Sequence, residues 1–233
     1  MSGKVALVTG VGPGTGSAIV RRFAQGNYAI AMIARSGARL DELARDLPGT
    51  HAFAADVTDT RAMDGVLARI TRELGAPEVV IHNAVGAVFG NFQEIDPALL
   101  ERNFQVNVMA LLHLVRRTAP AMIAAGRGAI VVTGNTSALR GKANFAGFAP
   151  TKAAQRVLAE SIARELGPKG VHVAYIVIDA VIDLDWTRKM RPDAPDDFFI
   201  QPRDIAAEVW HVAHQPRSAW SFNVEIRPSG EQW

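Results

Sequence analysis

Short apolar runs alternate with longer amphipathic segments along almost the whole chain. Most of the apolar runs lack a polar face, which is typical of parallel strands covered on both sides. The pattern predicts strands at residues 4–9, 28–34, 51–55, 79–83, 129–134, 172–178 and 222–226. Apolar residues at helical spacing predict helices at residues 15–26, 37–47, 60–74, 98–125, 149–167 and 203–213. The fourth helix has a specific start signal, because Asp96 suits the capping position and Pro97 the first helical position.

This alternation predicts an α/β fold, a Rossmann-type doubly wound parallel sheet of about seven strands with helices on both faces. Neither a low-complexity linker nor an internal repeat interrupts it. The length of 233 residues suits one large domain, so we expect a single domain over residues 1–233. In such a sheet, ligands bind at the carboxyl ends of the strands.

Composition narrows the functional classes. The formal net charge is only +2 and the basic residues are spread along the chain, which argues against nucleic acid as a partner. The absence of cysteine excludes disulfides and thiolate chemistry. The N-terminal residues enter an apolar strand without a secretory leader, and no apolar run is expected to span a membrane. We therefore expect a soluble cytoplasmic protein that does not bind membranes.

The first predicted strand runs directly into the glycine-rich stretch TGVGPGTG, residues 9–16. Gly10, Gly14 and Gly16 permit a tight turn, close approach of a pyrophosphate to the backbone and close packing of the next helix. The free N–H groups at the start of that helix also favour an anion. A turn selected only for packing is the alternative, but its position between a strand and a helix favours dinucleotide binding.

Further motifs follow in the order of a known family. The stretch ADVTD follows the third strand, HNAVG ends the fourth, and FQVNV lies in the long fourth helix. With TGVGPGTG, these stretches resemble the motifs of the short-chain dehydrogenase/reductase family, although His82 and Val85 depart from its NNAG motif. The resemblance covers nearly the whole chain and implies one NAD(P)-binding Rossmann domain. It assigns the cofactor contacts to Gly10, Pro13, Gly14, Thr15, Gly16, Asp56, Val57, Asn83, Ala84 and Lys152.

The end of the second strand indicates which dinucleotide is bound. A carboxylate there would bind the ribose hydroxyls of NAD and repel a 2′-phosphate, but the chain has Ala34 followed by Arg35. The guanidinium of Arg35 can pair with a phosphate in a fork geometry. We therefore predict NADP as the cofactor. Arg39 is a weaker candidate, better explained as part of a solvated helical face. The alternative is that Arg35 is an ordinary solvated loop residue.

The catalytic segment departs from the family. The family pattern is YxxxK, whereas residues 148–152 read FxxxK, and Asn135 stands where the family usually has Ser. The resemblance thus places Asn107, Asn135, Phe148 and Lys152 at the four catalytic positions. Phe148 has no proton to donate, and general acid catalysis is typically worth ~10²- to 10⁴-fold in rate. We expect either a handicapped enzyme or another proton donor, for which Lys152 is a candidate.

Some of these residues have explanations that need no catalysis. In the family the Lys also contacts the nicotinamide ribose, so Lys152 is expected wherever the dinucleotide is bound. For Asn107, a proton relay and a purely structural hydrogen bond are equally good interpretations. His82 is better explained as a hydrogen-bonded structural residue than as a general acid. We expect no metal site, because no ligand accompanies His82 at suitable spacing.

Two functional classes follow. The first is an NADP(H)-dependent oxidoreductase acting on an unknown small carbonyl or alcohol substrate, with a degenerate Ser/Tyr pair. The alternative is a catalytically weak or inactive dinucleotide-binding module that acts as a sensor or interaction protein. The changes cluster at the nicotinamide end, where Ile178 and Asp179 also replace the family's PG motif. This distribution suits both classes, and we favour the enzyme.

Two more expectations concern the surroundings of the site. The segment 183–199, which contains prolines and two adjacent aromatic residues, is interpreted as a mobile substrate lid. The family usually pairs two long helices across two-fold axes, which here implies a homodimer or homotetramer through residues 101–125 and 149–167. The alternative for their apolar residues is that they only face the sheet.

Overall fold

A central parallel sheet organises the chain, and the computed structural model describes it over residues 3–230. Within these residues seven strands form the sheet in the order β3-β2-β1-β4-β5-β6-β9. They are β1 (Val5–Thr9), β2 (Ala29–Ala34), β3 (Thr50–Ala54), β4 (Val79–His82), β5 (Gly128–Asn135), β6 (Val171–Ile178) and β9 (Asn223–Ile226). The order reverses between β1 and β4. The Rossmann-type fold and all seven predicted strands are confirmed.

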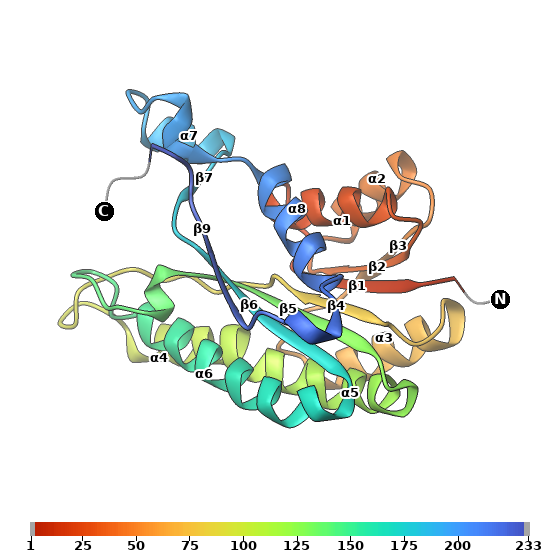
Figure 1. Cartoon of the computed structure of the whole chain (residues 1–233). Coiled ribbons are helices and arrows are strands. Elements are labelled where there is room, and N and C mark those ends of the chain that lie inside the picture. The colour runs from red at the N-terminus through yellow and green to blue at the C-terminus, as the bar shows by residue number, and fades with distance from the viewer. Residues whose placement is uncertain (1–2, 231–233) are drawn as a thin grey trace.

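Helices cover both faces of the sheet (Figure 1). One face carries α1 (Thr15–Ala24), α2 (Gly37–Asp46) and α8 (Pro202–Ala213). The other carries α3 (Thr60–Glu73), α5 (Ala110–Ala125) and α6 (Ala149–Leu166). Such three-layer packing explains why most strands are apolar on both faces, since both faces are buried.

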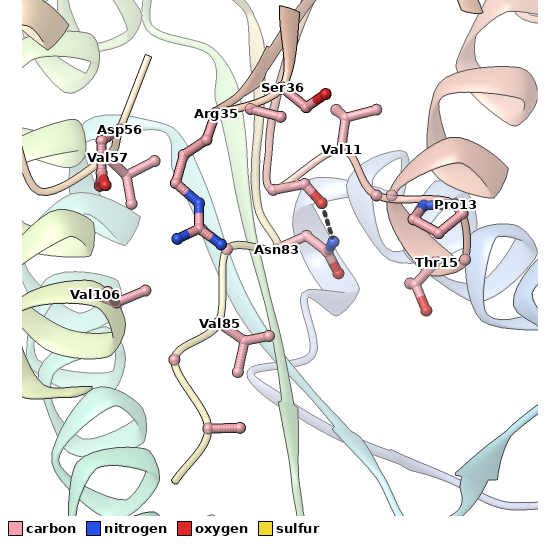
Figure 2. Close-up of a pocket in the computed structure, with 18 of the residues that line it drawn as sticks. Val11, Pro13, Thr15, Arg35, Ser36, Asp56, Val57, Asn83, Val85 and Val106 are labelled. Carbon is pink, nitrogen blue, oxygen red and sulfur yellow. Dashed lines mark hydrogen bonds between the residues drawn. The ribbon is translucent and has the colours of Figure 1, made fainter. Parts of the chain in front are cut away.

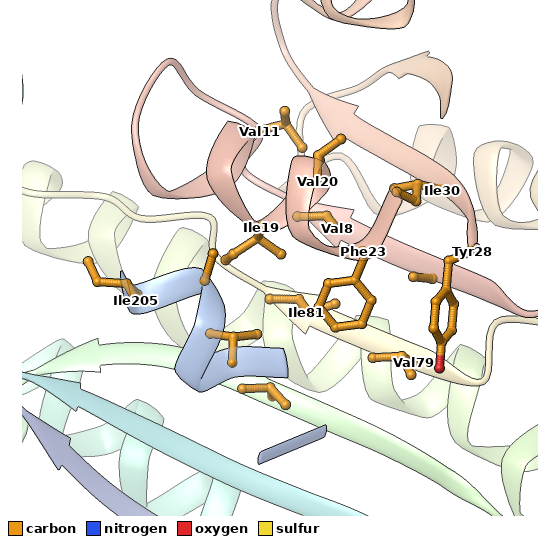
Figure 3. Packing of buried hydrophobic residues seen from close by; sticks show 14 of the residues in the cluster. Val8, Val11, Ile19, Val20, Phe23, Tyr28, Ile30, Val79, Ile81 and Ile205 are labelled. Atoms are coloured by element: carbon orange, nitrogen blue, oxygen red, sulfur yellow. The ribbon is translucent and has the colours of Figure 1, made fainter. Parts of the chain in front are cut away.

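On the first face, α1 inserts a hydrophobic stripe between the sheet and α8 (Figure 3). Ile19, Val20 and Phe23 recur at helical spacing and are fully buried. The ring of Phe23 packs edge-on against Trp210 of α8, with 5.0 Å between the centroids. This packing fixes the position of α1, and therefore of the glycine-rich turn that precedes it.

The predicted helix over residues 98–125 is interrupted in the structure. It consists of α4 (Pro97–Phe104), a π-helical segment η1 (Gln105–Met109) and α5. The side chain of Asp96 accepts a hydrogen bond of 2.9 Å from the Ala98 N–H, which confirms the predicted cap. The π segment, in which backbone bonds skip one more residue, was not predicted from the sequence, because apolar spacing alone does not reveal it.

The helical stretch Pro97–Ala125 is, within the described residues, the one helix long and apolar enough by length and composition to cross a membrane. That differs from the sequence-based expectation that no segment reaches this length. In the structure, Leu111, Leu114 and Val115 of this stretch are buried against the sheet. Core helices of globular domains meet the same length and composition criteria.

The segment that follows β6 is more ordered than a plain loop. It contains β7 (Val181–Ile182), which pairs in parallel with β8 (Phe199–Ile200), and the short helix α7 (Asp185–Met190) between them. Figure 1 shows α7 standing away from the sheet, near its carboxyl edge. Single 3₁₀ turns complete the described elements at Thr136–Ala138, Gly167–Lys169, Asp196–Phe198 and Arg217–Ala219.

Candidate active site

The main cavity lies where the strand order reverses, at the carboxyl ends of β1, β2 and β4. It has a volume of about 1020 Å³, and Figure 2 shows the side chains around it. This is the position at which doubly wound sheets bind ligands. The cavity is lined by the glycine-rich turn, by the segments after β2, β3 and β4, and by parts of α4 and of the segment after β6. The lining residues are 10–16, 34–36, 39, 55–58, 83–88, 99, 102, 103, 106, 182, 184 and 186.

The glycine-rich turn has no room for side chains at its critical positions. Gly10 has a φ of +72°, and a Cβ there would lie 2.5 Å from the Cα of Ala84. A Cβ on Gly16 would lie 2.5 Å from the carbonyl oxygen of Gly10. At Gly14 the neighbour is instead the flexible side chain of Leu184. The turn is therefore held close against both the end of β4 and the segment after β6.

The N-terminus of α1 has the features of an anion-binding site. No side chain caps this helix. The hydroxyl oxygen of Thr15 is buried and has no hydrogen-bond partner among the described residues, which is unusual for a polar atom next to a cavity. Free N–H groups, the helix dipole and an unpaired hydroxyl together fit the pyrophosphate of a dinucleotide.

Asn83 ties the turn to the sheet. Its side-chain amide donates a hydrogen bond of 2.8 Å to the Gly10 carbonyl (Figure 2). Its side-chain oxygen accepts one of 2.9 Å from the hydroxyl of Thr133 on β5. Asn83 thereby connects the ends of β1, β4 and β5 into one wall of the cavity.

Three arginines, Arg35, Arg39 and Arg102, line the cavity. Arg35 reaches from the end of β2 into the space between Asp56 and Asn83 (Figure 2). Burial opposes ionisation of Asp56, but hydrogen bonds from Thr58 and the charges of Arg35 and Arg102 outweigh this effect and lower its pKa. The cavity thus combines one ionised carboxylate with an excess of positive charge.

The residue at the family's Tyr position is buried under another aromatic ring. Phe148 immediately precedes α6 and is 4% exposed. Phe89, from the loop after β4, packs on it with 5.2 Å between the ring centroids and also contacts Phe145 at 5.0 Å. Gly90 and Phe145 form an isolated parallel bridge that holds this loop in place. Neither Phe148 nor Asn135 lines the main cavity.

Lys152 is fully enclosed, with only 2% of its surface exposed. Its ammonium donates to the carbonyl of Thr133 at 3.2 Å and to the side-chain oxygen of Gln155. Burial disfavours the charged form and lowers the pKa of Lys152 to about 7. A lysine with this pKa can both hold and release a proton at neutral pH.

The side chains of Asn107 and Asn135 form hydrogen bonds within the fold. The side chain of Asn107 accepts from the Gly86 N–H at 2.9 Å, and donates to the Gly86 carbonyl at 2.9 Å and the Thr151 hydroxyl at 2.8 Å. Both N–H donors and the oxygen of this buried amide are bonded within the fold, which supports the structural interpretation of Asn107. Asn135 caps the following 3₁₀ turn by accepting from the Ser137 N–H at 3.1 Å.

His82 is buried at the end of β4. Its Nδ1 lies 3.1 Å from the Thr9 hydroxyl, whereas its Nε2 lies toward the backbone of Val106 without forming a hydrogen bond. Burial, followed by the charge of Lys152, lowers the pKa of His82 to about 3. His82 is therefore neutral at physiological pH, in line with a structural residue. Within the described residues no cluster of His, Asp or Glu is suited to a metal ion.

Arg188 stabilises the segment after β6. This side chain makes two hydrogen bonds to Asp183, of 2.6 and 2.9 Å, and stacks over the ring of Phe199 at 4.2 Å. The bonds from Arg188 lower the pKa of Asp183 to about 2. The segment predicted as a lid thus contributes Trp186, which is 60% exposed, to the wall of the cavity.

Every predicted cofactor contact other than Lys152 lines the main cavity. Several lining residues were not predicted as contacts, among them Arg102, Leu184 and Trp186. They come from elements far along the chain, and no motif surrounds them. The one available signal was the position of Leu184 and Trp186 within the predicted lid.

Comparison with known proteins agrees with this geometry. Residues 4–194 match the family model described as short chain dehydrogenase. The chain belongs to the short-chain dehydrogenase/reductase family, whose members are oxidoreductases that bind a nicotinamide dinucleotide.

Individual relatives are similar over most of the chain. D-erythrulose reductase from Gallus gallus is 32% identical over 73% of this chain and 68% of its own length. L-xylulose reductase from Bos taurus is 30% identical over 74% of this chain and 70% of its own. A metagenomic short-chain oxidoreductase solved in complex with NADP is 26% identical, with a TM-score of 0.84 and 98% of each chain covered.

Proposed function

We propose that this protein is an NADP(H)-dependent oxidoreductase that reduces a small carbonyl compound or oxidises the corresponding alcohol. The observation that carries the cofactor choice is the position of Arg35, which points into the cavity at the end of β2 with no ion-pair partner among the described side chains. Arg39 lines the same wall. A 2′-phosphate would satisfy these guanidinium groups, which supports NADP over NAD.

The residues of the turn would hold the pyrophosphate, and the bound nicotinamide would supply or accept a hydride. Asp56 and Val57 would contact the adenine, and Asn83 and Ala84, which also line the cavity, would lie toward the nicotinamide end. The unpaired Thr15 hydroxyl supports this assignment, because a phosphate oxygen would give it an acceptor.

Lys152 is the proposed proton donor in place of the missing tyrosine. Its ammonium lies behind Thr133, whose hydroxyl bonds to the cavity residue Asn83. A pKa of about 7 gives Lys152 a proton that it can lose at the working pH. Because the side chain is buried, donation requires either a small opening or one intervening water molecule.

A second function has a specific observation in its favour. Phe89 packs on Phe148, the residue that the resemblance puts at the family's tyrosine position, and neither ring carries a hydroxyl. This arrangement supports a dinucleotide-binding module that senses NADP(H) without turnover. We favour the enzyme, because the cavity and the buried lysine are both present.

One experiment separates the two functions. Single-turnover oxidation of bound NADPH is followed by absorbance with a reactive diketone, D-erythrulose or L-xylulose as the test substrate; the sugars are chosen because relatives are reductases of these compounds. An enzyme oxidises NADPH with at least one of them, and Lys152→Met abolishes the reaction. Tight NADPH binding without oxidation by any carbonyl would favour the binding module.

The surroundings of the site complete the proposal. We place the protein in the cytoplasm, with a small-molecule substrate and without a nucleic-acid or membrane partner. We also propose a homodimer or homotetramer that forms through α5 and α6. Exposed apolar side chains on these two helices support this interface, Ile123 at 36% and Val157 at 58%.

A further inference from the structure

Gln155 connects the buried lysine to the interrupted helix. It lies one turn after Lys152 on α6 and is completely buried. Its side-chain oxygen accepts from the Lys152 ammonium, and its side-chain nitrogen donates a hydrogen bond of 2.6 Å to the backbone carbonyl of Asn107. The Tyr175 hydroxyl also donates to the side-chain oxygen, at 3.3 Å. The amide is therefore fixed at both ends, and it cannot rotate without breaking three buried hydrogen bonds.

The acceptor for Gln155 lies in the π segment. Asn107 lies within Gln105–Met109, where the backbone bonds skip one residue more than in an α-helix. The Asn107 carbonyl points to α6 and takes its hydrogen bond from the Gln155 side chain. Gln155 thus connects α6 to the π segment through one hydrogen bond.

Among the described residues, no carboxylate forms an ion pair with the Lys152 ammonium. The strand β5, the π segment and the 3₁₀ turn at Thr136–Ala138, which all pack against α6, have no titratable side chain. The titratable groups that face the ammonium are His82 of β4 and Tyr175 of β6, whose ring centroid is 5.9 Å from Nζ. Both are neutral at pH 7, since burial lowers the pKa of His82 to about 3 and raises that of Tyr175.

We propose that Gln155 is the positioning residue of the site: its amide holds the Lys152 ammonium between Thr133 and α6 and sets the acidity of that ammonium. The role of Lys152 as proton donor rests on the proposed function, whereas the effect of Gln155 on Lys152 does not. A neutral acceptor orients the ammonium without supplying the negative charge that would hold its proton. The lowered pKa of Lys152 agrees with this arrangement, because desolvation is its cause and no opposite charge counters it.

The charge on the acceptor should decide the acidity of Lys152. In Gln155→Glu a carboxylate replaces the amide, so the hydrogen bond to the Asn107 carbonyl is lost while the Lys152 ammonium gains a negative partner. The pKa of Lys152 should therefore rise by about 1 to 3 pH units, as expected for an opposite charge in contact. In Gln155→Met the side chain keeps its length but loses the acceptor, so the pKa should fall below the wild-type value. Opposite shifts from two substitutions at one position are not expected from a general loss of packing.

The test is a direct titration of Lys152 by NMR. The chain has five lysines, so labelling with ¹³Cε-lysine gives few signals, and Lys152→Met identifies the one that disappears. We expect the wild-type Lys152 signal to titrate well below the other four, and to move upward in Gln155→Glu and downward in Gln155→Met. Ile162→Val, a buried change on the same helix, controls for loss of stability and should leave the Lys152 titration unchanged.

The outcomes separate this inference from the proposed function. If neither Gln155 variant moves the Lys152 titration, or if Ile162→Val moves it equally, Gln155 is only structural and the inference is wrong. If one Gln155 variant does not fold, the direction in which the other moves the Lys152 titration still tests the inference. If the titration moves and the pH profile of single-turnover NADPH oxidation moves with it, both proposals are supported. If the titration moves but the rate profile does not, Gln155 positions Lys152 and Lys152 is not the proton donor.

Discussion

The ring of Phe89 packs on that of Phe148 at 5.2 Å between centroids, so Phe148 is buried while Phe89 remains 56% exposed. Two phenylalanines that are far apart in the sequence thus close the position from which a tyrosine would act in this family. The contact has two consequences for the chemistry. Phe148 offers no proton, and the ring of Phe89 covers part of its surface.

The first prediction concerns this missing hydroxyl. The double variant Phe148→Tyr with Asn135→Ser should oxidise NADPH faster than the wild type with a reactive diketone, by up to ~10²- to 10⁴-fold, because a general acid is restored. The single change Phe148→Tyr should give less, because members of a catalytic unit act together. The measurement is single-turnover absorbance at equal NADPH occupancy.

Adding Phe89→Ala tests the covering ring. Removal of this side chain should increase the rate of the double variant further, since the new hydroxyl becomes accessible. Phe92→Ala is a matched control, because Phe92 is exposed and has no ring contact with Phe148. Unchanged rates in all variants, with NADPH bound, would show that proton donation is not the limitation.

The second prediction concerns the cofactor. Arg35→Ala should weaken NADPH binding by roughly 10- to 150-fold, the range for loss of charge-assisted hydrogen bonds, and should leave NADH binding nearly unchanged. Arg45→Ala removes the same charge from the exposed end of α2 outside the cavity and should have little effect. Fluorescence or calorimetric titration with both dinucleotides measures the difference. Equal weakening of NADPH and NADH would remove the 2′-phosphate assignment.

The third prediction concerns the glycine-rich turn. Gly16→Ala should destabilise the fold by about 1–3 kcal/mol and impair dinucleotide binding, because the new methyl would overlap the Gly10 carbonyl. Gly12→Ala is the control in the same turn, since a Cβ there meets nothing within 4 Å. Urea unfolding and NADPH titration of both variants provide the comparison. Similar behaviour of the two alanine variants would contradict the packing role of Gly16.

The fourth prediction concerns pH. The folded-state pKa of Lys152 is about 7 and its ordinary value is 10.5, so between these values the unfolded chain binds more protons. The contribution of Lys152 therefore makes stability rise with pH in this window, whereas below pH 7 the full cost of burying the charge is present. Between pH 7 and 9 this rise should be about 2 kcal/mol in the free energy of unfolding.

Lys152→Met should remove this rise and should be more stable than the wild type near pH 6. Lys142→Met, at an exposed lysine, should retain it. Urea unfolding at several pH values measures both effects. A wild-type pH dependence that survives in Lys152→Met would mean that Lys152 titrates at its ordinary pKa.

The fifth prediction concerns assembly. Light scattering after size exclusion should give two or four times the mass of one chain, and Val157→Glu should reduce it, because a charge on the exposed face of α6 would be buried in the interface. Met190→Glu on α7 is a control, as Met190 is also exposed but lies outside α5 and α6. A monomeric wild type would exclude the proposed interface.

The sequence by itself determined the seven strands, the main helices, the cap at Asp96 and the glycine-rich turn. These features depend on local chemistry: the period of apolar residues, the preference of a capping side chain, and the positive φ at Gly10. The wall of the cavity followed as well, since the carboxyl ends of parallel strands meet at one edge of the sheet. For that reason the sequence predicts that Arg35, Asp56 and Asn83 lie along one cavity.

Only the tertiary structure decided how the altered catalytic positions are filled. Phe89 covers Phe148, and Gln155 joins Lys152 to the carbonyl of Asn107, 48 residues earlier in the chain. The π segment that presents this carbonyl leaves no signal in the apolar pattern. Each of these contacts brings together residues from separate elements, and its energy depends on burial that exists only after the sheet and helices have packed. The pKa of Lys152 is set in the same way, because a lysine loses its solvation only when the folded chain encloses it.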